Sequence, residues 1–199
     1  MKKEHLRQEF LQKRLALSSK EVAQAGKRVA ELFLSLSAYR QAKVLLLYYA
    51  FRQEVPTEKI ILTSLAEGKL VALPVTLREK KEITARLIKA YPDDLVPGPG
   101  GIPEPRPTCP SVPPEKIDLV AVPGLVFDLK GYRLGYGWGC YDRFLSRSPA
   151  LRVGLAYDFQ IVEDVGAEPH DQRLHLLVTP SCIYHFDEVE TWKKRSWKR

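Results

Sequence analysis

The sequence of 199 residues has few cysteines, a single methionine and no long apolar run. Its three cysteines, Cys109, Cys140 and Cys182, are widely spaced and form no Cys-x-x-Cys pair, which argues against a disulfide framework and a zinc site. The longest apolar run, Val44 to Phe51, is far shorter than the roughly 20 residues that cross a bilayer. The residues after Met1 are charged, unlike the apolar core of a signal peptide. We therefore expect a cytoplasmic protein without a membrane partner.

The sequence has more basic than acidic residues. Thirty-one Lys and Arg against 24 Asp and Glu give a net charge of +7, and part of the excess lies in a basic tail at about residues 193–199. This balance suits nucleic acid, and equally nucleotide phosphates or a polycarboxylate substrate. Hydrophobic residues make up 45% of the chain, which is enough for one buried core at this length. We predict a single domain over residues 1–199.

Apolar periodicity predicts helices that alternate with short buried strands. A capping box of Ser18 and Glu21 marks the start of the second helix, and a Pro- and Gly-rich segment, 92–114, predicts an ordered or semi-ordered loop. Alternation of this kind predicts an α/β fold whose mainly parallel sheet is covered on both sides, with ligands at the carboxyl ends of the strands. The predicted helices are 2–16, 18–36, 56–66 and 142–145, and the predicted strands are 44–49, 70–75, 119–123, 153–155 and 176–178, with a further short segment at 85–88.

A glycine-rich stretch from Arg133 to Leu145 is the densest motif. Gly135, Gly137 and Gly139 alternate with larger residues, and positive φ at such glycines can turn successive amides toward one anion ahead of a helix. The dinucleotide pattern Gly-x-Gly-x-x-Gly fails at Cys140, and neither Gly-Lys pair is followed by the Ser or Thr of a Walker loop. The motif therefore indicates phosphate binding of another kind, while a simple connecting turn stays an alternative.

The stretch Val122–Asp128, the glycine loop and Tyr141-Asp142-Arg143 together resemble the 5-formyltetrahydrofolate cyclo-ligases, also called methenyltetrahydrofolate synthetases. The resemblance covers nearly the whole chain, including Lys3, Leu6-Arg7, Glu54 to Thr57, Ile102 to Pro105 and His170-Asp171. It implies a three-layer α/β/α sandwich with a mixed, mainly parallel sheet. It also implies ATP-driven conversion of 5-formyltetrahydrofolate to 5,10-methenyltetrahydrofolate with release of ADP and phosphate. Phosphorylation of the N5-formyl oxygen would give an iminium phosphate that N10 attacks.

The same resemblance assigns roles to individual residues. For the ATP site these are Lys3, Arg7, Arg133, Leu134, Gly135, Tyr136, Gly137, Trp138, Gly139, Cys140 and Tyr141. For the folate site they are Tyr49, Glu54, Tyr136, Gly137, Trp138, Gly139 and Cys140. The implied magnesium ligands are Asp142 and Asp171, and magnesium normally bridges few carboxylates to nucleotide phosphates.

Each of these assignments has an ordinary alternative. Lys3 and Arg7 can be a solvated helix end, Tyr49 a core aromatic, Glu54 a surface acid, and Asp142 a helix cap. Asp171 can likewise be a loop acid. Two positions depart from the family: Trp138, where some members have Lys, and Cys140, where most have an aromatic residue. Without a lysine at position 138, charge neutralisation falls to the metal, Lys3, Arg7 and Arg133, and Trp138 can instead stack on a ring.

Two other functions remain as alternatives. The glycine loop alone permits another phosphate-ester or acyl-transfer enzyme on a similar scaffold. The basic tail and its tryptophans permit a nucleic-acid-binding module, although the glycine loop and paired acids would then have no role. We expect a monomer that binds ATP, Mg²⁺ and 5-formyltetrahydrofolate, with or without a polyglutamate tail, and no nucleic acid.

Overall fold

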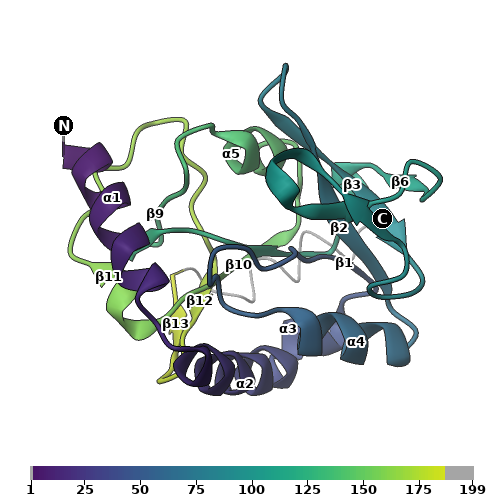
Figure 1. The fold of residues 1–199 in the computed structure, drawn as a ribbon, viewed down its shortest axis with the longest axis horizontal. Coiled ribbons are helices and arrows are strands. Elements are labelled where there is room, and N and C mark those ends of the chain that lie inside the picture. The colour runs from purple at the N-terminus through teal and green to yellow at the C-terminus, as the bar shows by residue number, and fades with distance from the viewer. Residues whose placement is uncertain (1, 187–199) are drawn as a thin grey trace.

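The computed structural model describes residues 2–186 and is built around one eight-stranded sheet (Figure 1). Five central strands run parallel, and each of the three strands toward the edges pairs antiparallel with its inner neighbour. The mixed, mainly parallel sheet predicted above is therefore confirmed. In order across the sheet, the strands are β13 (Ile183–His185), β12 (Leu176–Val178), β10 (Leu151–Leu155), β7 (Leu119–Val122), β1 (Val44–Leu46), β2 (Leu70–Leu77), β3 (Glu82–Ile88) and β6 (Ser111–Val112).

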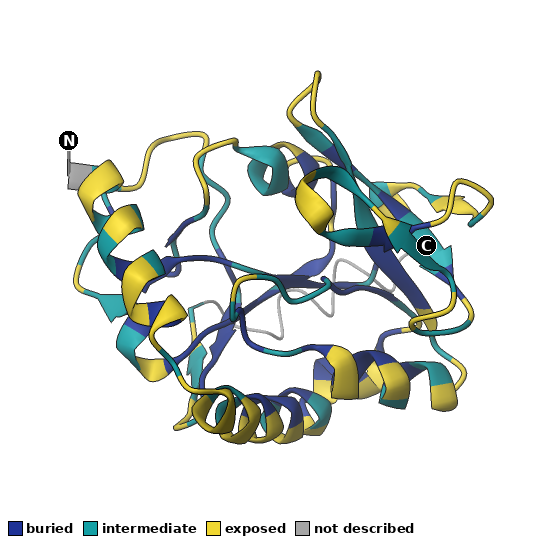
Figure 2. Ribbon diagram, viewed as in Figure 1, coloured by how far each residue is buried: buried dark blue, intermediate teal, exposed yellow. Residues whose placement is uncertain are grey.

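One face of this sheet is covered by α2 (Ser19–Ser35), α3 (Ser37–Gln41) and α4 (Glu58–Ala66), which lie along the lower side in Figure 1. Side chains alternate across each strand, so Leu45 packs in the cluster under these helices while Leu46 packs in the cluster on the opposite face. Figure 2 shows the result as buried strands between partly exposed helices. The short continuous apolar runs of the sequence are thus strands buried on both faces.

The other outer layer combines a short helix with a second sheet. It contains α5 (Cys140–Leu145) and three strands in the order β11 (Ile161–Val162), β8 (Val126–Asp128) and β9 (Arg133–Leu134). The amino-terminal helix α1 (Lys2–Leu15) packs on this small sheet, with Phe10 against Val126 and Leu134. The three layers are therefore present, with part of one outer layer made of β-structure.

Several element boundaries differ from the sequence-based prediction. The Pro- and Gly-rich segment contains a two-stranded hairpin of β4 (Leu95–Pro97) and β5 (Pro103–Pro105). The segment predicted at 85–88 extends into the longer strand β3, since β2 pairs with it over seven residues. Helix α3 and strand β13 had no predicted counterpart. Three short 3-10 helices complete the fold: η1 (Pro99–Gly101), η2 (Pro114–Lys116) and η3 (Asp158–Gln160).

The start of α2 is confirmed in detail. The Ser18 hydroxyl accepts a hydrogen bond from the Glu21 amide at 3.3 Å, and the Glu21 carboxylate accepts one from the Ser18 amide at 2.8 Å. This reciprocal pairing satisfies two amides that a helix start leaves open. Within residues 2–186 there is no helix both long and apolar enough to cross a membrane.

Candidate active site

The site lies at the carboxyl ends of the central parallel strands. Glu54 follows β1, Gly124 follows β7 and Tyr157 follows β10. The Tyr157 hydroxyl donates a hydrogen bond to the Gln53 carbonyl at 3.0 Å, which joins two of these loops across the strand between them. In doubly wound sheets this edge is where ligands bind.

The glycine loop presents an unpaired run of backbone amides. Gly137 has φ +90° and Gly139, which precedes α5, has φ +65°, so positive φ is confirmed at two of the three alternating glycines. Within the described part of the chain, none of the amides from Gly135 to Gly139 donates a hydrogen bond to the protein. Arg143 fixes the loop by donating to the carbonyls of Trp138 and Lys81. Free amides in such a turn form an anion-binding nest.

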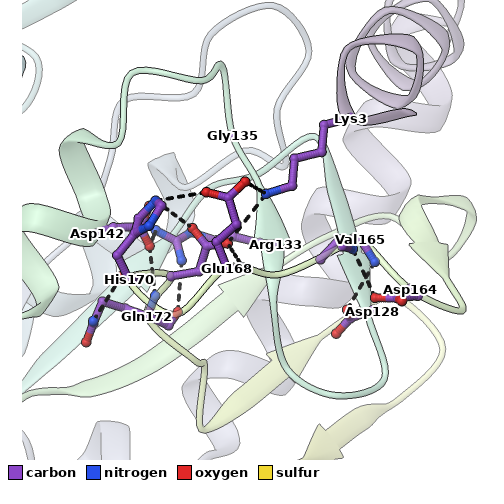
Figure 3. A network of polar contacts seen from close by, with 12 residues as sticks. Lys3, Asp128, Arg133, Gly135, Asp142, Asp164, Val165, Glu168, His170 and Gln172 are labelled. Atoms are coloured by element: carbon purple, nitrogen blue, oxygen red, sulfur yellow. Dashed lines mark hydrogen bonds and ion pairs between the residues drawn. The ribbon is translucent and has the colours of Figure 1, made fainter. Parts of the chain in front are cut away.

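Two basic residues of α1 lie beside this loop. The Arg7 Nε atom donates to the Gly135 carbonyl at 3.0 Å, and its guanidinium lies 3.4 Å from the point where a Cβ atom on Gly137 would stand. Lys3 extends toward the loop around Glu168, as Figure 3 shows, with Nζ 2.8 Å from the Glu168 carboxylate and 3.9 Å from that of Asp171. The helical spacing of Lys3 and Arg7 thus places two cations at one site, although Lys3 is paired with carboxylates.

Arg14 is a further residue of the site, and nothing in the sequence singled it out. Its side chain is only 1% exposed. It donates to the carbonyls of Arg52 at 3.0 Å and Gly124 at 3.2 Å, and to the Tyr136 hydroxyl at 2.6 Å. One buried guanidinium therefore holds the loop after β1, the loop after β7 and the glycine loop together. No periodicity in the sequence separates such a residue from a solvated one.

Glu54 is buried and faces Arg14. One of its carboxylate oxygens accepts a hydrogen bond from the Phe51 amide at 3.1 Å, and the other lies 3.9 Å from the Arg14 guanidinium. Burial raises the pKa of Glu54 to about 7, against the opposing effects of the Arg14 charge and the Phe51 amide. A buried carboxylate without a second strong donor is suited to accept hydrogen bonds from a ligand.

Arg133 and Asp142 form a pair beneath the loop. The Arg133 guanidinium lies 3.1 Å from an Asp142 carboxylate oxygen that also accepts the Gln172 amide at 2.9 Å, and Arg133 donates to the Gln172 carbonyl (Figure 3). Arg133 is buried, and Leu134 packs in the core beside Phe10. Because its side chain is in the core, Leu134 could contact a nucleotide only through its backbone.

The two predicted magnesium ligands lie near each other. Because Asp142 accepts the amide of Gln172, it lies beside the residue that follows Asp171. Each carboxylate already faces a cation, Asp142 facing Arg133 and Asp171 facing Lys3. Among residues 2–186 no three His, Cys, Asp or Glu side chains gather closely enough to hold a metal alone. Two hard carboxylates fit magnesium that takes its remaining ligands from water and phosphate.

The remaining residues predicted for the site are exposed or half-buried. Tyr136 and Trp138 are 44% and 49% exposed. Tyr49 is half-buried, with its ring centroid 6.4 Å from that of Tyr91. Cys140 is half-buried, and burial raises the pKa of its thiol. The exposed ring of Trp138 is available for stacking on a flat ligand, whereas the Tyr136 ring faces the guanidinium groups of Arg14 and Arg52, each 5.9 Å from its centroid.

Asp128, the last residue of the quoted motif, has a structural role. It is fully buried, and its carboxylate accepts the amides of Lys130, Tyr132 and Val165 at 2.9–3.2 Å. The bonds from Lys130 and Tyr132 close the turn between β8 and β9, and the bond from Val165, drawn in Figure 3, ties this turn to the segment after β11. The turn sets the direction in which the chain enters the glycine loop.

Comparisons with known proteins identify the family of the chain. A family model described as the 5-formyltetrahydrofolate cyclo-ligase family matches residues 1–180. The 5-formyltetrahydrofolate cyclo-ligase of Haemophilus influenzae is 34% identical over 175 residues, or 85% of this chain and 93% of that protein. The Escherichia coli protein of the same name is 30% identical over 180 residues, or 88% and 98% of the two chains.

A solved structure extends the likeness to the fold. The 5,10-methenyltetrahydrofolate synthetase of Aquifex aeolicus superposes with a TM-score of 0.84 at 36% identity and covers 94% of each chain. The protein of that name from Mycoplasma pneumoniae superposes with a TM-score of 0.75 at 25% identity, covering 90% of this chain and 99% of the other. With sequence and fold matching over most of its length, the chain belongs to the 5-formyltetrahydrofolate cyclo-ligase family.

Proposed function

We propose that this protein converts 5-formyltetrahydrofolate to 5,10-methenyltetrahydrofolate at the expense of ATP, with magnesium, in the cytoplasm and as a monomer. The observation that carries the proposal is the meeting of α1 with the glycine loop. Arg7 bonds to Gly135 and Arg14 to Tyr136, across 128 and 122 residues of sequence. The glycine loop with its unpaired amides adjoins Arg7, and the buried Glu54 adjoins Arg14.

The phosphate end of the site is the glycine loop. Its free amides from Gly135 to Gly139 would grip a triphosphate, and Arg7 stands over Gly137 to neutralise it. Lys3 would exchange its exposed contact with Glu168 for phosphate, and the exchange is easy because exposed ion pairs are worth little. Arg133 supports the loop from beneath through Asp142.

The folate end centres on Glu54. A carboxylate at this position accepts hydrogen bonds from the donor edge of a pterin, and the neighbouring Arg14 charge favours its ionised form. Trp138 offers an exposed ring on which a flat ligand can stack, and Tyr136 is held beside Glu54 by its contact with Arg14. Tyr49, which like Glu54 follows β1, is the further residue proposed to contact the folate.

Asp142 and Asp171 are the proposed holders of magnesium, which when bound would offset phosphate charge during transfer. The protein residues otherwise align the reactants and exclude water. The formyl oxygen attacks the terminal phosphorus, and the bond to ADP breaks with its electron pair leaving on ADP. N10 then attacks the formyl carbon, its proton passes to water, and the carbon–oxygen bond breaks with the pair leaving on phosphate.

A direct assay tests this proposal. Purified protein with 5-formyltetrahydrofolate, ATP and magnesium should form the methenyl product, seen by its absorbance, together with one ADP for each turnover. Omission of ATP or magnesium should stop the reaction. Absence of product while another phosphorylated or acylated compound is consumed would overturn the proposal in favour of a different transferase.

The same assay separates an enzyme from a nucleic-acid-binding module. Deletion of the basic tail, residues 193–199, which lies outside the described residues, should leave turnover largely unchanged. Salt-sensitive RNA binding that the deletion abolishes, in a protein that never turns over folate, would contradict the proposal.

Asp171→Asn should raise the magnesium concentration needed for half-maximal rate, since it removes a charged oxygen ligand.

A further inference from the structure

Within residues 2–186, three arginines hydrogen-bond to the glycine loop. Arg7 and Arg143 each donate to a backbone carbonyl of the loop, whereas Arg14 holds a side chain, donating to the Tyr136 hydroxyl at 2.6 Å. The amides of the loop make no hydrogen bonds to this part of the protein. The position of the loop therefore depends on these three side chains.

Arg14 differs from the other two arginines because it also reaches the folate end of the proposed site. The Nη2 atom that donates to Tyr136 lies 3.9 Å from a Glu54 carboxylate oxygen. The Nε atom donates at 3.0 Å to the carbonyl of Arg52, two residues before Glu54. The other contacts of the remaining two arginines lie on α1 itself and on the turn between β2 and β3. Arg14 is thus the anchor of the glycine loop that also faces Glu54.

The side chain of Arg14 is almost fully buried, so it acts through its neighbours and not on a ligand. A guanidinium is planar, and its donors point in fixed directions. A displacement of Tyr136 therefore also turns the nitrogen that faces Glu54. Phosphate bound at the glycine loop and a pterin bound at Glu54 act on the same guanidinium from two sides.

We propose that Arg14 is a positioning residue that couples the two ends of the site. Phosphate held by the glycine loop fixes Tyr136, and Tyr136 through Arg14 fixes Glu54 for the pterin. This inference rests on the proposed function. Since coupling between two binding sites is reciprocal, each ligand tightens the binding of the other by the same factor.

Tyr136→Phe tests the coupling, because it removes the hydroxyl that Arg14 binds and keeps the ring. Calorimetry measures Kd of 5-formyltetrahydrofolate with and without magnesium and a non-hydrolysable ATP analogue. In the wild-type protein the analogue should tighten folate binding about five-fold or more. In Tyr136→Phe this factor should fall to within about two-fold of unity. A hydroxyl with a purely structural role would change both dissociation constants and leave their ratio unchanged.

Tyr157→Phe is the matched control. The Tyr157 hydroxyl donates to the Gln53 carbonyl at 3.0 Å and joins the loops after β10 and β1. Its loss should lower the thermal midpoint and leave the coupling factor at the wild-type value. Arg14→Lys keeps a cation near Glu54 without the fork of donors, so it should also reduce the factor. Combined with Tyr136→Phe, it should reduce the factor no further, because both changes break one contact.

Three results would overturn the inference: no coupling in the wild-type protein, coupling that survives in Tyr136→Phe, or an equal loss of coupling in Tyr157→Phe. If Arg14→Lys does not fold, the comparison of the two tyrosine variants still decides the matter. A failure of the wild-type protein to bind 5-formyltetrahydrofolate or the ATP analogue would instead overturn the proposed function.

Discussion

Replacement of Glu54 by glutamine should make the protein more stable at alkaline pH while weakening folate binding. In the folded protein, burial raises the pKa of Glu54 from its ordinary value of 4.5 to about 7. The folded state therefore binds more protons than the unfolded state between these two values. Stability contributed by this group is highest below pH 4.5 and falls as the pH rises through 7.

The size of the effect follows from the same two values. Each pKa unit corresponds to about 1.4 kcal/mol, so the buried carboxylate costs about 3 kcal/mol of unfolding free energy above pH 7. Glutamine has nearly the same shape and no charge. For a domain of this size, about 3 kcal/mol is a rise of about 6–12 °C in the thermal midpoint. Near pH 5, where the folded wild-type protein already has a neutral Glu54, the two proteins should differ little.

Urea titrations of the ligand-free protein at pH 5 and pH 8 measure this difference. Glu79→Gln, in the exposed turn between β2 and β3, is the matched control and should shift neither midpoint. In turnover assays Glu54→Gln should raise KM for folate by at least about ten-fold, because a hydrogen bond to a charged group is lost. A stability gain of equal size at both pH values would refute the reasoning, as would a loss at pH 8.

Two further changes address the framework of the site. Arg14→Met should lower the unfolding free energy by about 3 kcal/mol or more, because it leaves the buried Glu54 without its cation and the Arg52 carbonyl without its donor; Lys13→Met, at an exposed neighbour, should cost less than about 1 kcal/mol in the same urea titration. Gly137→Ala places a Cβ atom at φ +90° beside Arg7, so it should cost about 1–2 kcal/mol and raise KM for ATP. Gly68 has a similar φ of +74° and open space around it, so Gly68→Ala should lower stability without affecting KM for ATP. A raised KM for ATP in both variants would contradict a local role for Gly137.

The central fold could be predicted from the sequence because its signals are local. The apolar runs that became β1 and β7 are flanked by polar residues and turns, and the capping box of Ser18 and Glu21 marks a helix start by chemistry alone. Edge elements were harder to predict. Strand β13 is only three residues long and half-buried, so it carries little apolar pattern, and its pairing with β12 depends on the rest of the sheet.

The candidate site could be predicted only in part. Positive φ at Gly137 and Gly139 could be predicted from the sequence, since glycine tolerates this conformation at little cost. The roles of Arg14 and of the Glu168 contact with Lys3 depend on residues more than 100 positions apart. The sequence of α1 contains five basic residues, at positions 2, 3, 7, 13 and 14, and only the tertiary packing distinguishes the buried Arg14 from the exposed Lys13 beside it.

The docking of α1 has a consequence for how the protein is made. This helix is synthesised before the groups it binds, because the carbonyls and the hydroxyl that Arg14 contacts belong to residues 52, 124 and 136. An isolated helix of 14 residues is only marginally stable in water. Helix α1 can therefore dock fully only after residue 136 has been synthesised, and the site is assembled at that step.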